Sequence, residues 1–223
     1  MKQLEILKME IVTEKKIKGS AQQLRGFVSK MYPEYTELHN HDCNKLVYGY
    51  PHIQYKIING KAYIIGIEDG MDIIKEIYSG LSKIKLGNTL IKVDELKFDY
   101  DKFDFGVCDE TQYYTTKTPY IALNSANYDK YIDSDELEKD GLLKKIVTGN
   151  LLSMSKSFDY HVENKIDVKI MNRIEQSVKI KGMGSVGFHC IFNVNFEIPN
   201  MLGIGRNVAK GFGSVEKLNG IGK

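Results

Sequence analysis

Ile53-Gln54-Tyr55-Lys56-Ile57-Ile58-Asn59-Gly60-Lys61-Ala62-Tyr63-Ile64-Ile65-Gly66-Ile67 is the stretch that decides the fold. Two runs rich in isoleucine and tyrosine flank the dipeptide Asn59-Gly60. Asparagine and glycine tolerate the positive φ angles of a two-residue hairpin turn, so this dipeptide is a strong hairpin signal. We therefore predict two antiparallel strands, at 53–58 and 61–67.

The chain before this hairpin indicates one strand and one helix. Residues 3–12 are typical of a strand, and residues 20–31 have apolar side chains at helical spacing. Ser20 is a suitable N-cap, and Pro33 ends the helix. The apolar positions of this helix are Leu24, Phe27, Val28 and Met31.

The chain after the hairpin repeats the pattern. Residues 71–81 predict a second helix, and residues 90–98 predict a fourth strand. The resulting order, β-α-β-β-α-β within about 100 residues, is the ferredoxin-like arrangement. The fold class that we expect is α+β.

The second half gives weaker signals. An acidic segment broken at Gly106 suggests a boundary, so we expect domains 1–105 and 106–223. The expected elements are a strand or strand pair over 112–123, a helix over 133–154, short strands at 165–170 and 176–181, and strands at 188–198 and 214–218. Asp133 and Glu136 would form the helix's capping box, while Gly141 and Gly149 weaken it. We therefore expect two tandem ferredoxin-like domains, the second degenerate.

Composition sets the class of protein. The 223 residues carry a net charge of only +2, and the basic residues gather in 1–30, 141–183 and 201–223. The three cysteines are far apart, without a C-x-x-C pair, which favours neither a zinc site nor disulfides. Neither a signal peptide nor a transmembrane segment is evident, so we expect a cytoplasmic protein without a membrane partner.

A second stretch, Gly203-Ile204-Gly205-Arg206-Asn207-Val208-Ala209-Lys210-Gly211-Phe212-Gly213, points to function. Backbone N–H groups in a glycine-rich loop can turn toward an anion, and Arg206 and Lys210 add positive charge. The stretch is neither a Rossmann fingerprint nor a P-loop. We expect a cradle for a phosphate backbone, with a glycine-rich turn of no function as the alternative. The candidate RNA-binding residues are Gly203, Gly205, Arg206, Lys210, Gly211, Phe212 and Gly213.

The pattern G-x-G-x5-G-F-G before a final short strand resembles the C-terminal glycine-rich signature of the CRISPR-associated RNA-processing endoribonucleases. This family belongs to the repeat-associated RNA-binding superfamily, which is built from ferredoxin-like domains. The signature covers only about 15 residues, but the β-α-β-β-α-β order of the first half indicates the same fold independently of it. The resemblance implies a CRISPR repeat RNA as substrate.

The histidines supply candidate chemistry. His39, His41 and His52 fall within fourteen residues. His39 and His41 with Asp42 could bind a metal, but a fourth ligand is not evident. Imidazole suits proton transfer near neutral pH, so the other interpretation is metal-free cleavage of RNA.

The segment His39-x-His41, followed by Tyr48 and by residues 50–56, resembles one branch of that endoribonuclease family, which is associated with type I systems. The resemblance implies that His41 is the lead catalytic residue and His39 its helper. It also makes Tyr48 and Lys30 candidate supporting groups.

We therefore expect a metal-independent endoribonuclease with no cofactor. It would cleave CRISPR repeat RNA in the precursor transcript, leaving 2′,3′-cyclic phosphate and 5′-OH ends. One alternative is a non-catalytic RNA-binding subunit of a CRISPR effector complex, and another is a metal-dependent nuclease. A homodimer and CRISPR effector-complex proteins stay open as partners.

Overall fold

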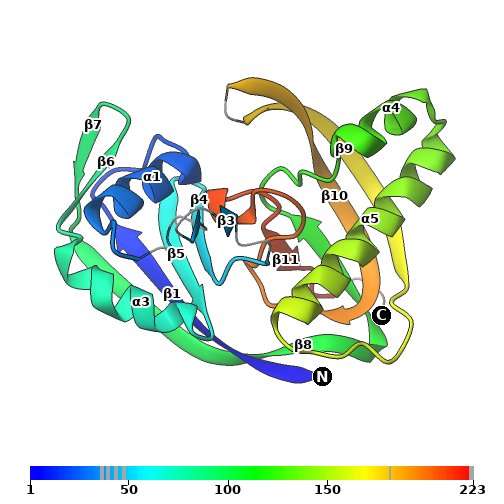
Figure 1. Ribbon diagram of the computed structural model, residues 1–223, viewed down its shortest axis with the longest axis horizontal. Helices are drawn as coiled ribbons and strands as arrows, with labels where there is room; N and C mark the ends of the chain where they lie inside the picture. Colours follow the sequence, from blue (N-terminus) through cyan, green and yellow to red (C-terminus); the bar gives the residue numbers. More distant parts are fainter. Residues whose placement is uncertain (36–37, 39–40, 43–44, 47–48, 181, 221–223) are drawn as a thin grey trace. The chain divides into compact units, whose positions relative to one another are not determined.

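The computed structural model describes residues 1–35, 38, 41–42, 45–46, 49–180 and 182–220, and at 41–42 and 45–46 it describes the backbone alone (Figure 1). The chain divides into two compact units. The N-terminal unit comprises Gln3–Phe103 and Val208–Gly211. The C-terminal unit comprises Met1–Lys2, Asp104–Asn207 and Phe212–Lys223. No helix among the described residues is long and apolar enough to cross a membrane.

The sheet of the N-terminal unit has the order β4-β5-β1-β8. Its strands are β4 (Ile53–Ile58), β5 (Lys61–Ile67), β1 (Lys2–Val12) and the first part of β8 (Glu95–Thr116). Numbered along the chain, this is the order 2-3-1-4 of a ferredoxin-like domain. Ile58 pairs with Lys61, and Asn59 and Gly60 have φ angles of 54° and 80°. The predicted hairpin and its turn are confirmed.

Two helices bury the apolar side of this sheet. They are α1 (Ala21–Met31) and α3 (Gly70–Ile77), and a 3₁₀ turn, η1 (Tyr78–Gly80), follows α3. Ser20 caps α1 and forms a capping box with Gln23, as its type predicts. Leu24 and Val28 of α1 and Ile74 of α3 are fully buried in one core. Local sequence signals and tertiary packing agree in this unit.

One prediction for this unit is wrong in detail. The strand expected over 90–98 is two strands: β7 (Thr89–Lys92) pairs with β6 (Lys83–Leu86), and β8 starts at Glu95. Val93 and Asp94 separate the two strands. The Val93 amide donates to the Ser82 carbonyl, and the Asp94 amide donates to the Val12 carbonyl. Both runs are β-rich, so periodicity alone could not separate them.

The C-terminal unit repeats the ferredoxin-like strand order. Its strands are the rest of β8, β9 (Val168–Ile180), β10 (Met183–Glu197) and β11 (Val215–Lys217). Thr115 of β8 pairs with Ile191 of β10 and also with Glu216 of β11, so these two strands flank β8 on opposite edges. With β9 on the far side of β10, the order along the chain is 4-1-3-2.

This second domain is degenerate, as expected. The N-terminal unit has α3 before its fourth strand, but the connection 198–214 before β11 has no α-helix, and its one helical turn is the 3₁₀ helix η2 (Val208–Lys210). The predicted alternation of β10 is confirmed, because Phe188, Cys190, Phe192, Val194 and Phe196 are all buried. The long hairpin of β9 and β10 curves along its whole length (Figure 1).

Three boundaries in this unit differ from the predictions. The helix expected over 133–154 is α5 (Glu136–Ser157), preceded by α4 (Ser125–Asp133). Asp135 caps α5 with Glu138, so the predicted capping box was wrong. Gly141 and Gly149 face open space and do not interrupt α5.

The two short strands expected near 165–181 are the single strand β9, because it pairs with β10 over its length. The strand expected over 112–123 ends at Thr116, with an isolated bridge from Tyr120 to Phe188.

Lys56 of β4 is a lysine buried inside the N-terminal unit. Its neighbour Tyr55 lies in the core under the helices, so alternation points Lys56 to the opposite face of β4. The side chain is fully buried, and its Nζ has no hydrogen-bond partner among the described residues. Burial lowers the pKa of Lys56 to about 7, because removal from water disfavours the charged form.

We predict that Lys56→Met stabilises the fold, more at pH 6 than at pH 9. The unfolded chain keeps this lysine protonated up to its ordinary pKa, so between about pH 7 and 10.5 it binds more protons than the folded chain. The unfolding free energy of the wild type therefore rises with pH in that window. Below the window, burial of the protonated Lys56 lowers the unfolding free energy by its full amount, up to about 5 kcal/mol. Urea unfolding of both proteins at the two pH values measures the difference.

The matched control is Lys97→Met, which removes an exposed lysine of the same unit. Its effect on the unfolding free energy should be small at both pH values. An equal gain for Lys56→Met at pH 6 and pH 9 would contradict the lowered pKa.

Candidate functional site

The candidate catalytic loop connects α1 to β4. His39 and Tyr48 lie outside the described residues. His41 belongs to β2 (His41–Asp42), which pairs with β3 (Lys45–Leu46) in a short antiparallel ladder. The backbone of His41 is thus held opposite Leu46.

The residue before His39 is anchored to α1. Leu38 is buried, and its carbonyl oxygen accepts two hydrogen bonds from that helix. Ser29 Oγ donates at 3.0 Å, and Arg25 Nε donates at 3.1 Å. Burial lowers the pKa of Arg25 from its usual range. The residue that directly precedes His39 is therefore held at a fixed point on α1.

Sequence reasoning missed Arg25 and Ser29. It assigned α1 from its apolar face, whereas these two side chains occupy positions i and i+4 beside that face. That spacing was the available signal, but it named no partner. Lys30, the predicted supporting group, is exposed in the last turn of α1.

The remaining histidines have local partners or are exposed. His52 Nδ1 contacts Asp69 at the start of α3, in line with the structural role expected from its place before a strand. His189 Nε2 lies 2.8 Å from the side-chain oxygen of Gln176 on β9. His161 is exposed. Within the described ranges no three His, Cys, Asp or Glu side chains are grouped to hold a metal ion.

The glycine-rich stretch is tied to the chain by its own backbone. The amide of Ile204 donates to Gly213 at 2.9 Å, and the amide of Gly213 donates to Pro119 at 2.9 Å. The amide of Arg206 donates to Ile121 at 3.0 Å. Hydrogen bonds within the chain thus occupy several of the N–H groups that an anion cradle would need.

The seven candidate RNA-binding residues differ in exposure and in unit. Arg206 is exposed; Gly205, Lys210 and Phe212 are half-buried; Gly203, Gly211 and Gly213 are buried. Lys210 and Gly211 belong to the N-terminal unit, and the other five belong to the C-terminal unit. Within the C-terminal unit, Arg206 is therefore the cation of this stretch that a ligand can reach.

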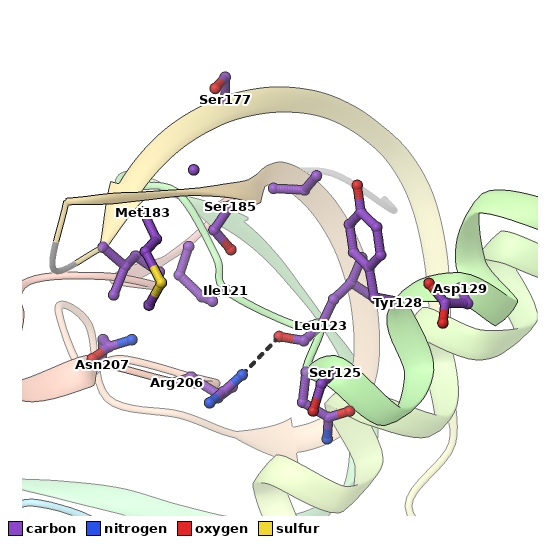
Figure 2. A pocket seen from close by; sticks show the side chains of 14 residues that line it. Ile121, Leu123, Ser125, Tyr128, Asp129, Ser177, Met183, Ser185, Arg206 and Asn207 are labelled. Carbon is purple, nitrogen blue, oxygen red and sulfur yellow. Dashed lines mark hydrogen bonds between the residues drawn. The ribbon is translucent and has the colours of Figure 1, made fainter.

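Arg206 lines a groove of ≈ 950 Å³ in the C-terminal unit (Figure 2). The guanidinium donates from Nη1 to the Leu123 carbonyl at 3.1 Å, drawn as a dashed line. Tyr128 of α4 is 41% exposed, and Met183 at the start of β10 is 69% exposed. Ser125 and Ser185 add hydroxyl groups to the wall. These groups suit an unpaired nucleotide, because a cation such as Arg206 binds the phosphate and an aromatic ring such as Tyr128 stacks on the base.

Comparison with known proteins accounts for both units. Residues 2–104 match the Cas6b N-terminal domain, and residues 106–218 match the Cas6b C-terminal domain. A protein of Methanocaldococcus jannaschii, MJ0978, is 50% identical over 112 residues, which are 50% of this chain and 76% of that protein.

Solved structures agree. A crystal structure of Cas6b is 38% identical, with a TM-score of 0.91 over 97% of this chain and 100% of that one. A crystal structure of the CRISPR RNA processing endoribonuclease Cas6b is 36% identical, with a TM-score of 0.78 over the same shares. A Cas6 product complex, 12% identical with a TM-score of 0.62 over 96% of this chain and 99% of that one, shares the fold.

These matches span both tandem ferredoxin-like domains and confirm the resemblance that the glycine-rich stretch and the histidine loop indicated. The chain belongs to the Cas6b family.

Proposed function

We propose that this chain is a metal-independent endoribonuclease that cleaves CRISPR repeat RNA and releases guide RNAs from the precursor transcript. The observation that carries the proposal is the pair His39-x-His41, which follows α1 in a chain that matches Cas6b over both domains. A non-catalytic RNA-binding subunit would have no need for that pair.

The chemistry requires one group to take a proton and one to give it. A base removes the proton of the ribose 2′-OH, whose oxygen attacks the adjacent phosphorus. An acid protonates the 5′-oxygen that leaves, so the products carry a 2′,3′-cyclic phosphate and a 5′-OH. His39 and His41 fill these two roles because imidazole exchanges protons near neutral pH. Tyr48 and Lys30 support the charged transition state as donors.

The anchor at Leu38 supports this assignment. A catalytic side chain must be held close to its productive geometry, because a small misplacement costs much of the rate. Arg25 and Ser29 fix the carbonyl that directly precedes His39. We infer that they position the loop without touching the RNA.

RNA binding divides between side chains and backbone in this proposal. Arg206 contacts a phosphate from the groove, and Lys210 adds charge. The glycines act mainly through conformation: Gly213 has a φ of 65°, and a Cβ there would collide with the Ile204 carbonyl oxygen.

The first test is cleavage of a labelled repeat RNA in EDTA. We expect the wild type to cut, and we expect His39→Ala/His41→Ala to cut about 10²–10⁴-fold more slowly in single turnover while still binding the RNA. A substrate with a 2′-deoxy nucleotide at the cut site should stay intact, because it lacks the nucleophile. His161→Ala, an exposed histidine of the C-terminal unit, is the matched control and should cut normally.

Each other result would exclude part of the proposal. Loss of wild-type cutting in EDTA indicates a metal-dependent nuclease. Normal cutting by the double variant removes His39 and His41 from the active site. Tight binding of the repeat by the wild type without any cutting identifies the non-catalytic subunit.

The second test separates conformation from contact in the glycine-rich stretch. Gly213→Ala should lower the unfolding free energy by about 2–4 kcal/mol, because it combines a positive φ with a collision. Gly220→Ala is the control: its φ is 84° but its Cβ faces open space, so about 1 kcal/mol is expected. Arg206→Ala should leave stability within about 1 kcal/mol and weaken RNA binding.

Unfolding in urea and RNA binding by fluorescence anisotropy give the two quantities. If Gly213→Ala binds RNA more weakly at unchanged stability, the backbone there contacts the RNA directly, and the conformational role is wrong.

A further inference from the structure

A lysine-rich surface lies on the N-terminal unit and contains none of the candidate site residues. It consists of the loop 13–19, between β1 and α1, and the β6–β7 hairpin (Figure 1). The two segments line a groove of ≈ 540 Å³, with Lys15, Lys16, Lys18 and Lys92 and the carboxylates Glu14 and Asp94 in its wall. The six lysines of the surface as a whole are Lys15, Lys16, Lys18, Lys83, Lys85 and Lys92.

The hairpin holds its lysines on one exposed face. Ile84 and Leu86 of β6 are buried in the core beside α1, so the alternate residues Lys83 and Lys85 point outward. Lys83 pairs directly with Lys92 across the ladder. Two like charges at such a position destabilise a hairpin, so the fold gains nothing from this pair.

The loop is fixed rather than free to turn its lysines away. Ile17 is buried in the same core, and its amide donates to Gly60 at 2.8 Å. The Thr13 hydroxyl donates to the Lys15 carbonyl at 2.8 Å. With Ile17 pointing inward, Lys16 and Lys18 on either side of it are exposed.

The charges of this surface are not balanced within the chain. Elsewhere in the unit, Lys30 has no carboxylate partner among the described residues, but five other lysines do; the pairs are Lys8–Asp99, Lys61–Glu10, Lys75–Asp72, Lys97–Glu95 and Lys102–Glu5. On the lysine-rich surface, only Lys92 has an acidic partner among the described residues, Asp94 at 3.9 Å. Apart from Lys30, the exposed lysines of the unit that have no carboxylate partner among the described residues therefore gather on the lysine-rich surface.

We propose that this lysine-rich surface is a second, sequence-independent binding surface for the sugar–phosphate backbone of RNA. Lysine ammonium groups bind phosphates as point charges and make poor readers of bases. Their unpaired charge complements a polyanion. Leu90 is the exposed apolar side chain of the hairpin, too little for insertion into a membrane. The choice of RNA over other polyanions rests on the proposed function.

The test uses the charge reversal Lys83→Glu/Lys85→Glu and the wild-type protein. Binding of an uncleavable repeat RNA, with a 2′-deoxy nucleotide at the cut site, is measured against salt concentration. Each lost phosphate contact on a single strand should reduce the salt slope by about 0.7, so we expect a slope that is less steep by roughly 1.4. Cutting of the ordinary repeat at saturating protein should not change.

The stability of the variant gives an independent signature. The substitution Lys83→Glu places a carboxylate opposite the Lys92 ammonium group, so it should raise the melting temperature by about 1–3 °C while weakening RNA binding. The control Lys61→Glu/Lys97→Glu makes the same change of charge on exposed lysines that have partners in the same unit. It should lose much less of the salt slope. A loop variant, Lys15→Glu/Lys18→Glu, tests the surface without altering the hairpin.

Equal slopes for the surface variants and the control would overturn the proposal. The proposal would also be overturned in favour of a membrane if the wild type bound phosphatidylserine vesicles through Lys83 and Lys85 while the charge reversal left RNA binding unchanged.

An unrelated RNA of the same length separates this proposal from the proposed function. If the wild type cuts no repeat but binds both RNAs through these lysines, the surface stands and the endoribonuclease does not. If the wild type cuts the repeat but binds both RNAs equally well without these lysines, the endoribonuclease stands and the proposed surface does not.

Discussion

The double pairing of β8 in the C-terminal unit constrains the glycine-rich stretch. Thr115 of β8 pairs with β10 on one edge and with β11 on the other. The chain must therefore cross from one edge of β8 to the other between Glu197 and Val215. In the N-terminal unit a helix makes the equivalent crossing and satisfies its own backbone groups. The C-terminal unit crosses without an α-helix and with only the single 3₁₀ turn η2, so most N–H groups of the crossing must find partners in neighbouring segments, at close approach. Glycine at a position such as 213 permits that approach.

This constraint changes how the glycine signature relates to function. The glycines serve the crossing first, and the exposed Arg206 is carried to the wall of a groove as a result. A signature that marks RNA-binding proteins can therefore be largely a signature of how one connection is built. Affinity would then come from side chains around it, since ammonium and guanidinium groups supply most of the energy of backbone binding.

The N-terminal unit separates three uses of positive charge. Some exposed lysines pair with carboxylates, those of the lysine-rich surface other than Lys92 do not, and Lys56 is buried without a partner among the described residues. Burial of an unpaired lysine lowers stability, and like charges facing across a hairpin do so as well. Features that oppose folding in this way commonly mark positions that selection retains for another purpose.

The sequence by itself determined the elements whose signals are local. Asn59-Gly60 specified the hairpin, Ser20 the start of α1, and the alternation of 188–198 the buried face of β10, because turn chemistry, capping and periodicity act within a few residues. It also named the histidine loop and the glycine-rich stretch. Only the tertiary structure decided that the Leu38 carbonyl is held by Arg25 and Ser29, that Gly213 faces Ile204, and that Lys56 is covered. Each of these depends on a partner or a covering layer distant in sequence, and a residue's own type and spacing carry no record of what packs against it.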